Sequence, residues 1–167
     1  LSYIFKFFAP FLYRGSAVEC PVCERSFSKF LSYGSEVAHR ENVLCPYDLT
    51  LERHRLMWLY LQRETNFFTA QKLKVLHIAP EQCFLPHFKK QKNLDYITAD
   101  LVSPIADLHF DLHNIPLEDQ QYDVVFCNHV MEHVDDPIRC MSELQRVMKN
   151  GGWAIMQVPQ DVTRDVT

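Results

Sequence analysis

Cysteines in the first third of the sequence are spaced as the ligands of a metal ion are. Cys20 and Cys23 form a C-x-x-C pair, and Cys45 opens the similar segment CPYD, which ends at Asp48. A zinc ribbon closes its tetrahedral site with two short turns of this kind, each of which holds a pair of ligands. The sequence therefore predicts a structural zinc site formed by Cys20, Cys23, Cys45 and Asp48.

The fourth ligand is the irregular part of this pattern, because a carboxylate stands where a zinc ribbon has a cysteine. Structural zinc sites prefer nitrogen and sulfur ligands, although an aspartate can also bind the ion. His39 and His54 are the alternatives to Asp48 for this position. A metal-free knuckle with free thiols is the other interpretation of the same residues.

A second group of polar residues directly follows apolar runs of the type that form buried strands. Asp100 follows the run at 94–99, and Asn128 and His129 follow the run at 122–127. In open α/β sheets, ligands bind beyond the carboxyl ends of the strands, and a carboxylate after the second strand holds the ribose hydroxyls of a nucleoside. Asp100 is therefore the predicted ribose ligand. His129 is the predicted catalytic residue, which would orient or deprotonate an acceptor.

The elements that must position these residues alternate between strands and helices. Short apolar runs predict strands at 74–78, 94–99, 106–110, 122–127 and 153–158. A helix is expected after the first strand, with an inner face formed by Phe84, Leu85 and Phe88. Buried strands joined through helices pair in parallel and form right-handed βαβ units, so the pattern predicts an α/β fold.

Two further helices have recognisable ends. Asp136 and Pro137 predict the start of a helix, because aspartate caps the first turn and proline fits the first helical position. The 149–152 segment KNGG predicts its end. Thr50 is the predicted cap of an earlier helix at 51–64. Helical spacing predicts that the later helix buries Ile138, Met141, Leu144, Val147 and Met148.

The segment YDVVFCNHVMEHVDDP, followed by ELQRVMKNGGWAIMQVP, resembles the fourth and fifth strands of class I S-adenosylmethionine-dependent methyltransferases. The knuckle at Cys20, the segment LERHR and the strand VLHIAPE are similar to a bacterial subgroup with a cysteine-rich N-terminal extension. The resemblance covers residues 20–160. It implies a Rossmann-like three-layer α/β sandwich with a mostly parallel sheet, S-adenosylmethionine as the cofactor, and methyl transfer as the activity.

The resemblance also implies which residues hold the cofactor. In the family, the first strand ends in an acidic residue and a glycine-rich loop of the form VLDIGCGTG, where residues 75–83 read VLHIAPEQC. His77 stands at the acidic position and Ala79 at the first glycine, while Glu81 could contact the amino group of the cofactor. By the same resemblance, Asp111 contacts adenine, with Leu112 beside it. The implied cofactor-binding residues are His77, Ala79, Glu81, Asp100, Leu101, Asp111, Leu112, Asn128 and His129.

Composition and charge limit the other classes of protein. The net charge is −4, with nine basic and seven acidic residues in 1–72 but eight and fourteen in 73–167. A basic nucleic-acid footprint is therefore not visible at the level of charge. No apolar run reaches the ~18 residues of a membrane span, and the apolar start, broken by Lys6 and Pro10, is expected to be a packing helix. Six cysteines without a secretory signal indicate reduced thiols or a metal site, and hence a cytoplasmic protein.

The expected organisation has two regions. Residues 1–72 would form an N-terminal helix, the cysteine-rich zinc-ribbon-like knuckle and a connecting helix, and residues 73–167 would form the Rossmann-like methyltransferase domain. The last predicted strand ends at Val158. The segment DVTRDVT that follows is too short for the sixth and seventh strands of the family, so these strands are expected to be absent.

Other functions fit parts of the pattern. The glycine-free loop fits a methyltransferase-like binding module that has lost use of the cofactor, whereas Asp100 and Asp111 oppose that interpretation. A zinc-knuckle RNA methyltransferase fits the cysteines but not the acidic second half. An NAD-dependent enzyme is disfavoured, because the chain has no G-x-G-x-x-G segment. The expected acceptor is a small molecule or another group that the sequence does not identify, and the oligomeric state does not follow from the sequence.

Overall fold

The computed structural model describes residues 3–36 and 39–159 of the chain. The chain divides into two compact units, Leu1–Thr69 and Ala70–Thr167. None of the helices in the described ranges is long and apolar enough to cross a membrane. The segment DVTRDVT, on which the expectation about the sixth and seventh strands was based, falls in residues 160–167, outside the described residues.

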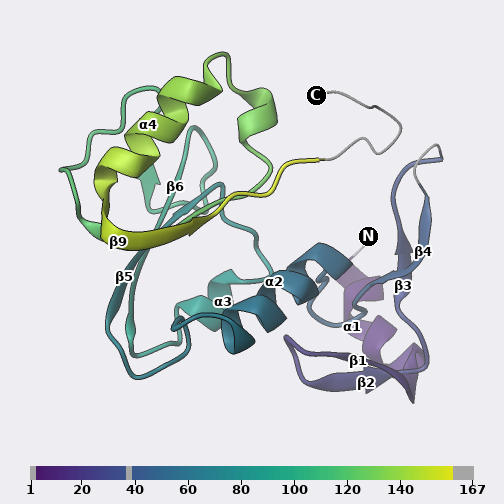
Figure 1. Cartoon of the computed structure of the whole chain (residues 1–167). Helices are drawn as coiled ribbons and strands as arrows, with labels where there is room; N and C mark the ends of the chain where they lie inside the picture. The colour runs from purple at the N-terminus through teal and green to yellow at the C-terminus, as the bar shows by residue number, and fades with distance from the viewer. Residues whose placement is uncertain (1–2, 37–38, 160–167) are drawn as a thin grey trace, which may run out of the picture. The chain divides into compact units, whose positions relative to one another are not determined.

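The first unit contains two antiparallel strand pairs and two helices (Figure 1). In chain order the elements are α1 (Tyr3–Leu12), β1 (Arg14–Cys20), β2 (Arg25–Phe27), β3 (Leu31–Tyr33), β4 (Arg40–Leu44) and α2 (Glu52–Arg63). Leu31, Leu44 and Leu51 form a small buried cluster. Domains below about 70–80 residues usually need a further staple besides such a core.

The two helices of this unit differ in detail from the prediction. The cap of α2 is Leu51 rather than Thr50, and Nδ1 of His54 accepts the Leu51 N–H at 3.1 Å. Thr50 is instead buried, and its hydroxyl donates to Oδ1 of Asp48 at 2.7 Å. Thr50 therefore supports the cysteine-rich turns and not the helix. In α1, Ala9 is buried but the neighbouring apolar side chains Phe8, Phe11 and Leu12 are exposed, so much of the described surface of this helix is open.

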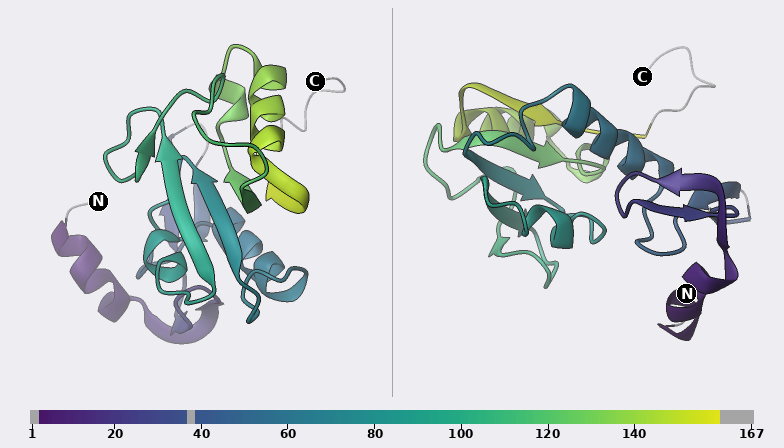
Figure 2. Two further views of the ribbon diagram at one scale, coloured as in Figure 1. Left: turned by 90° about the vertical axis from the view of Figure 1, so that its left-hand side faces the viewer. Right: turned by 90° about the horizontal axis from the view of Figure 1, so that it is seen from below.

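The second unit is an open parallel sheet with the strand order β7-β6-β5-β8-β9. Its elements are β5 (Leu73–Ile78), α3 (Leu85–Phe88), β6 (Leu94–Asp100), β7 (Leu108–His109), β8 (Tyr122–Cys127), the 3₁₀ helix η1 (Met131–His133), α4 (Pro137–Val147) and β9 (Met148–Ile155). Figure 2 shows β5 and β6 side by side, with their carboxyl ends at the same edge. The predicted Rossmann-like α/β fold is confirmed.

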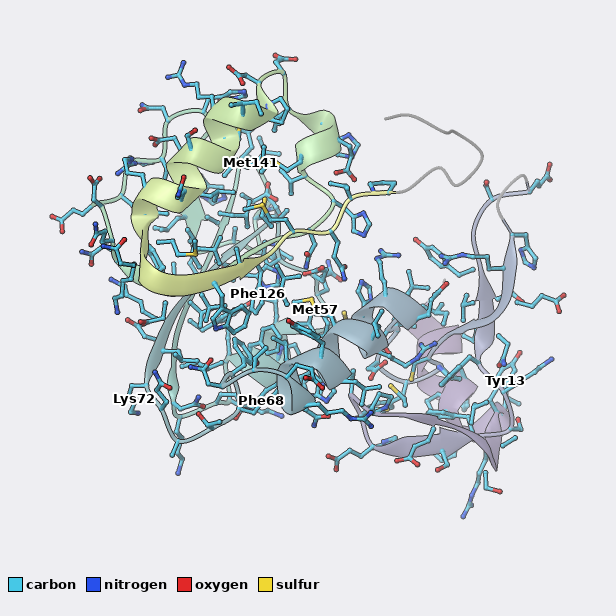
Figure 3. The ribbon with its side chains drawn as sticks, viewed as in Figure 1. Tyr13, Met57, Phe68, Lys72, Phe126 and Met141 are labelled. Carbon is cyan, nitrogen blue, oxygen red and sulfur yellow. The ribbon has the colours of Figure 1, made fainter. Side chains whose placement is uncertain are left out.

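Side chains from opposite faces of the sheet define three layers. On one face, α4 contributes to a core cluster that also holds residues of β5 and β8, namely Leu76, Ile78, Val125, Cys127, Cys140, Leu144 and Val147. On the other face, Phe126 of β8 lies 5.9 Å from the ring of Phe88 in α3; Phe126 is labelled in Figure 3. The connections after β5 and after β8 thus use opposite faces. The sheet therefore has its topological switch point between these two strands, where ligands bind in such folds.

The buried face of α4 differs from the predicted one. Ile138 is 68% exposed and Met141 is 40% exposed, whereas Cys140 is fully buried. Leu144 and Val147 are buried as expected. Two overlapping apolar stripes share Leu144 and Val147, and helical spacing alone does not decide which of them faces the sheet. The start of the helix is as predicted, since Asp136 caps it by accepting the Arg139 N–H at 3.0 Å.

The segment expected to end α4 belongs to a strand instead. β9 begins at Met148, directly after the helix, and its register with β8 shifts before Trp153. Gly151 has a φ of +82° inside this irregular stretch. A Cβ atom on Gly152 would lie 2.9 Å from the carbonyl oxygen of Asp123. The two glycines therefore allow a bulge that brings β9 close to β8. The strand also ends at Ile155 and not at Val158.

Hydrogen bonds from α4 hold the loop that precedes β8. Arg146 donates to the carbonyl oxygens of Ile115 and Leu117, each at 2.8 Å. Glu143 accepts the Ile115 N–H at 2.9 Å and pairs with Arg146 at 2.8 Å. The hydrogen bond from Arg146 lowers the pKa of Glu143 to about 2. This network positions the loop that begins at Asp111.

Glu143→Gln is expected to flatten the acid side of the stability profile. The folded pKa of Glu143 is about 2 and its ordinary value is 4.5, so between these values the unfolded state binds more protons. The contribution of Glu143 to the free energy of unfolding is therefore complete above pH 4.5 and is lost as the pH falls toward 2. Urea unfolding at several pH values in this window measures the loss. The exposed control Glu118→Gln should keep the wild-type slope, and equal slopes for Glu143→Gln and wild type would contradict the prediction.

Candidate functional site

A cleft of about 210 Å³ opens at the carboxyl edge of the parallel sheet. It brings together five of the residues predicted to bind a cofactor: Ala79, Asp100, Leu101, Asp111 and Leu112. Its other lining residues are Ile78, Phe110, Val130, His133 and Val134. The walls are thus mainly apolar and carry two carboxylates. Such a cleft suits a flat apolar group that has hydroxyl or amino substituents.

The end of β5 adopts a conformation that glycine normally supplies. Ala79 has a φ of +48°, and its N–H donates to the carbonyl oxygen of Ala99 at 2.8 Å. A left-handed conformation costs roughly 1–2 kcal/mol for a residue with a Cβ atom. The loop after β5 therefore turns into the cleft wall with an alanine at the position where the sequence pattern expects glycine.

Asp100 lines the cleft and is held in its turn through one carboxylate oxygen. Its Oδ1 atom accepts the N–H groups of Val102 and Ser103 at 2.9 and 2.8 Å. None of the described residues donates a hydrogen bond to its Oδ2 atom. The turn therefore fixes the side chain through one oxygen and leaves the other available to a ligand hydroxyl.

Asp111 is held by His113. The Oδ1 atom of Asp111 accepts the backbone N–H of His113 at 2.9 Å and lies 2.6 Å from Nδ1 of its ring. The Nε2 atom of the same ring accepts the Asp136 N–H at 3.2 Å, so the ring proton is on Nδ1 and is donated to Asp111. These bonds lower the pKa of Asp111. The loop with Asp111 is thereby tied to the cap of α4.

His77, Glu81 and Asn128 lie outside the cleft wall and form a hydrogen-bonded chain. His77 is fully buried, with Nε2 at 2.6 Å from Oε2 of Glu81 and Nδ1 at 2.7 Å from the hydroxyl of Tyr96. Asn128 donates to Oε1 of Glu81 at 3.1 Å. Burial raises the pKa of Glu81, but the hydrogen bond and charge interaction with His77 outweigh it, so the net pKa is lowered.

The two histidines that follow β8 differ in their surroundings. The N–H of His129 donates to the carbonyl oxygen of Gln157 at 2.7 Å, and the residue has a φ of +55°. Its Nδ1 atom lies 3.5 Å from Oε1 of Glu132, and its buried Nε2 atom has no partner among the described residues. The side chain of His133 is 75% exposed and lines the cleft.

Cys20, Cys23, Cys45 and Asp48 gather in the first unit, with their potential ligand atoms all within 4.8 Å of one another. The sulfur atoms of Cys23 and Cys45 are 3.8 Å apart, and Cys20 Sγ lies 3.3 Å from Oδ2 of Asp48. Hydrogen bonds from Cys23 and Cys45 lower the pKa of Cys20, and the bond to Cys20 raises the pKa of Cys45. The alternative ligands His39 and His54 are not in this cluster.

Two similar turns supply these side chains. In one, the N–H of Glu24 donates to the carbonyl oxygen of Cys20 at 2.8 Å, and in the other Leu49 donates to Cys45 at 3.2 Å. Glu24 and Leu49 both have positive φ, at +57° and +61°. Asp48 therefore occupies in the second turn the place that Cys23 has in the first. Its Oδ1 atom accepts from Thr50, which leaves Oδ2 directed at the sulfur of Cys20.

Comparison with known proteins gives the chain a family. The profile of the family described as "Methyltransferase domain" matches residues 63–156, which is more than half of the chain. The chain therefore belongs to this family of class I S-adenosylmethionine-dependent methyltransferases. The cysteine cluster lies outside the matched residues.

The individual proteins that are similar to this chain have a low sequence identity to it or match only a short part of it. A candidate sarcosine dimethylglycine methyltransferase from Galdieria sulphuraria has 16% identity and a TM-score of 0.50, over 62% of this chain and 47% of its own. A candidate methyltransferase from Bacillus halodurans has 22% identity and a TM-score of 0.44, over 52% and 39%. An uncharacterized 37.1 kDa protein in transposon TN4556 of Streptomyces fradiae is 39% identical over 49 residues, 29% of this chain and 14% of its own length. The chain thus spans less than half the length of each of these proteins, and the Galdieria likeness supports the fold alone.

Proposed function

We propose that this chain transfers a methyl group from S-adenosylmethionine to an acceptor, with the nucleoside of the cofactor in the cleft between Asp100 and Asp111. The observation that carries the proposal is this pairing of two fixed carboxylates with apolar walls at the carboxyl edge of a methyltransferase fold. The cleft, at about 210 Å³, is smaller than the roughly 300–1,000 Å³ of ordinary ligand pockets. In this proposal the cleft therefore holds the nucleoside of the cofactor, and the methionine end of the cofactor lies outside the cleft.

The residues of the cleft have separate roles in this proposal. Asp100 accepts hydrogen bonds from the ribose hydroxyls through its open Oδ2 atom, and Leu101 lies beside the sugar. Asp111 accepts a hydrogen bond from the amino group of adenine. Leu112 and the small side chain of Ala79 line the same cleft and would contact the base.

The bound cofactor supplies a methyl group on a positively charged sulfur. The chain itself must hold the acceptor in line with that group and, where the acceptor carries a proton, remove it. His129 is the proposed residue for this step, because it follows β8 at the carboxyl edge of the sheet and its Nδ1 atom faces Glu132 at 3.5 Å. The proposed acceptor is a small molecule.

Asp100→Asn is expected to weaken S-adenosylmethionine binding about 10- to 100-fold, the usual loss for a hydrogen bond to a charged group. The asparagine can keep Oδ1 in the turn but replaces the open acceptor by an amide N–H₂. Isothermal titration calorimetry of the full-length protein measures the affinity. Asp95→Asn, an exposed change at the start of β6, is the matched control and should bind like wild type. A folded wild-type protein that gives no heat would support a binding module that has lost the cofactor.

We also propose that Cys20, Cys23, Cys45 and Asp48 hold a structural zinc ion. Four ligands at ~2.3 Å for sulfur and ~2.0 Å for oxygen around a tetrahedral centre lie about 3.8 Å (sulfur–sulfur) and 3.5 Å (sulfur–oxygen) apart. The separations of 3.8 Å between Cys23 and Cys45 and 3.3 Å between Cys20 and Asp48 fit this arrangement. The hydrogen bonds from Thr50 orient Asp48, as an outer partner of a metal ligand does.

A further inference from the structure

We propose that the cysteine-rich unit has a ligand site of its own, which binds a small molecule that carries an aromatic ring and a phosphate group. The site, called the arginine pocket below, is a cavity of about 580 Å³ whose lining includes Phe11, Arg14, Arg25, Phe27 and Tyr47. Its volume lies within the roughly 300–1,000 Å³ of ordinary ligand pockets. These residues all belong to the first unit, so the inference does not depend on the proposed function.

Backbone contacts around Tyr13 hold the walls of the arginine pocket together. The Tyr13 N–H donates to the carbonyl oxygen of Ala9 in α1 at 3.0 Å, and the Tyr13 carbonyl oxygen accepts the N–H of Ser28, which follows β2, at 2.7 Å. Tyr13 is labelled in Figure 3. Gly15 permits this close approach, since a Cβ atom there would lie 2.7 Å from Cα of Ser28. Arg14 lies between Tyr13 and Gly15, so the position of its backbone relative to α1 and β2 is fixed.

The other arginine of the pocket is held by an aromatic ring. Cζ of Arg25 lies 3.7 Å from the centroid of the Tyr47 ring, which is a cation–π contact. Arg25 follows the turn that contains Cys23, and Tyr47 lies in the similar turn between Cys45 and Asp48. Each of the two cysteine-rich turns thus supplies one member of the stacked pair. Stacking uses the face of the guanidinium and leaves the N–H groups at its edge available to an anion.

The charges of the pocket point to an anionic ligand. Arg40, outside the pocket, pairs with Glu52. In the part of the chain that the structure describes, no oxygen atom accepts a hydrogen bond from Arg14 or Arg25, and the lining of the pocket includes no carboxylate. Arginine forms bidentate hydrogen bonds with phosphate. A phosphate monoester carries about −1.5 to −2 charges at neutral pH and thus matches two guanidinium groups better than a carboxylate does.

The remaining lining suits an aromatic ring. Phe27 is 2% exposed and therefore forms the inner side of the pocket, whereas Phe11 is 73% and Tyr47 is 49% exposed. The rings of Phe11 and Tyr47 thus have surface that a ligand can cover. Aromatic rings attract one another in offset-stacked and edge-to-face arrangements. A ligand with its phosphate at the two arginines and its ring against these side chains would use both parts of the lining.

An NMR titration of the nitrogen-15-labelled full-length protein with phenyl phosphate tests the site. The Nε–H signals of Arg14 and Arg25 should shift. Phenyl phosphate should bind about 3- to 10-fold more tightly than inorganic phosphate, which is the usual gain for an aromatic pair. It should also bind about tenfold more tightly than benzoate, which has a ring but only one negative charge.

Two arginine variants test the anion-binding groups. Arg14→Gln and Arg25→Gln should each weaken the binding of phenyl phosphate about tenfold, at the lower end for hydrogen bonds to charged groups, because both side chains are exposed. Their circular dichroism spectra should equal that of wild type. Arg40→Gln removes an arginine of β4 that does not line the pocket, so it is the matched control and should bind like wild type.

Phe11→Ser tests the aromatic wall. This variant should bind phenyl phosphate several-fold more weakly and inorganic phosphate with unchanged affinity, because only the former has a ring. Leu12→Ser is the matched control. Leu12 is the next residue of α1 and is 71% exposed, but it does not line the pocket, so its loss should change neither affinity.

Four results would overturn the inference. The first is a folded wild-type protein whose spectrum does not change at millimolar phenyl phosphate, and the second is an affinity that neither arginine variant lowers. The third is inorganic phosphate or benzoate binding as tightly as phenyl phosphate, since the site would then not select an aromatic phosphate. The fourth is a phosphotyrosine peptide that binds far more tightly than phenyl phosphate, which would assign the pocket to a protein segment and not to a small molecule.

Discussion

Cys45→Ser is expected to abolish zinc binding and to destabilise the cysteine-rich unit by several kcal/mol. Structural zinc contributes an apparent ~10–16 kcal/mol to the folding of small zinc-finger peptides at neutral pH. The buried cluster of Leu31, Leu44 and Leu51 in this unit is small, and the ion would add a cross-link between the two turns. Zinc per chain is measured by inductively coupled plasma mass spectrometry, and thermal unfolding is followed by circular dichroism with and without a chelator.

Two further variants test whether the zinc is bound by this cluster. Cys83→Ser removes a half-buried cysteine outside the cluster and should leave the zinc content at the wild-type value. Asp48→Cys supplies a fourth sulfur ligand and should tighten zinc binding, since structural zinc prefers thiolates. A wild-type protein that contains no zinc after purification in its presence, and that unfolds alike with and without a chelator, would refute the zinc site.

Phe126→Ala is expected to lower the free energy of unfolding by about 3–5 kcal/mol, the usual loss for a fully buried aromatic ring. Phe126 is fully buried on β8, and its ring lies 6.0 Å from that of Trp153 on β9. The layer between the sheet and α3 would lose its central ring and gain a cavity. Urea unfolding of the full-length variant and wild type measures the difference.

Ile138→Ala is the matched control for this variant. The side chain of Ile138 lies on the exposed side of α4, so its truncation should change the stability by roughly 0.5 kcal/mol or less. A loss of several kcal/mol for Ile138→Ala, or a loss below about 1 kcal/mol for Phe126→Ala, would contradict the layered core.

The fold could be predicted where local signals agree with the tertiary structure. The apolar runs of β5, β6 and β8 are bounded by polar residues, and β8 has the predicted bounds of Tyr122 and Cys127. Asp136 and Pro137 define the start of α4 because a cap is a local interaction. The buried face of the same helix could not be predicted. Ile138 is more apolar than Cys140, yet the contact with the sheet selects the stripe that contains Cys140.

The candidate site could be predicted only in part. The end of a strand indicated Asp100, because the carboxyl ends of parallel strands meet at one edge, whereas Asp111 followed from the resemblance to the family. His133 was missed as a lining residue, because its exposure depends on the path of the loop after β8. The bond between Tyr96 and His77 joins neighbouring strands, and the register that brings them together is set by the sheet. The equivalence of Asp48 and Cys23 was visible in the sequence, but the matching turns are a property of the structure.

Both edges of the sheet are cross-linked by a side chain of the central strand region. At the amino-terminal edge, Asp123 of β8 accepts the N–H of Lys74 in β5 at 2.8 Å and pairs with Lys149 of β9 at 2.9 Å. At the carboxyl edge, Asn128 after β8 donates to Glu81 after β5 at 3.1 Å, and its Oδ1 atom accepts the Gln157 N–H after β9 at 3.2 Å. One carboxylate and one amide thus each join the same three segments of the chain. The amide protons at both ends of β8 are therefore expected to exchange slowly with solvent.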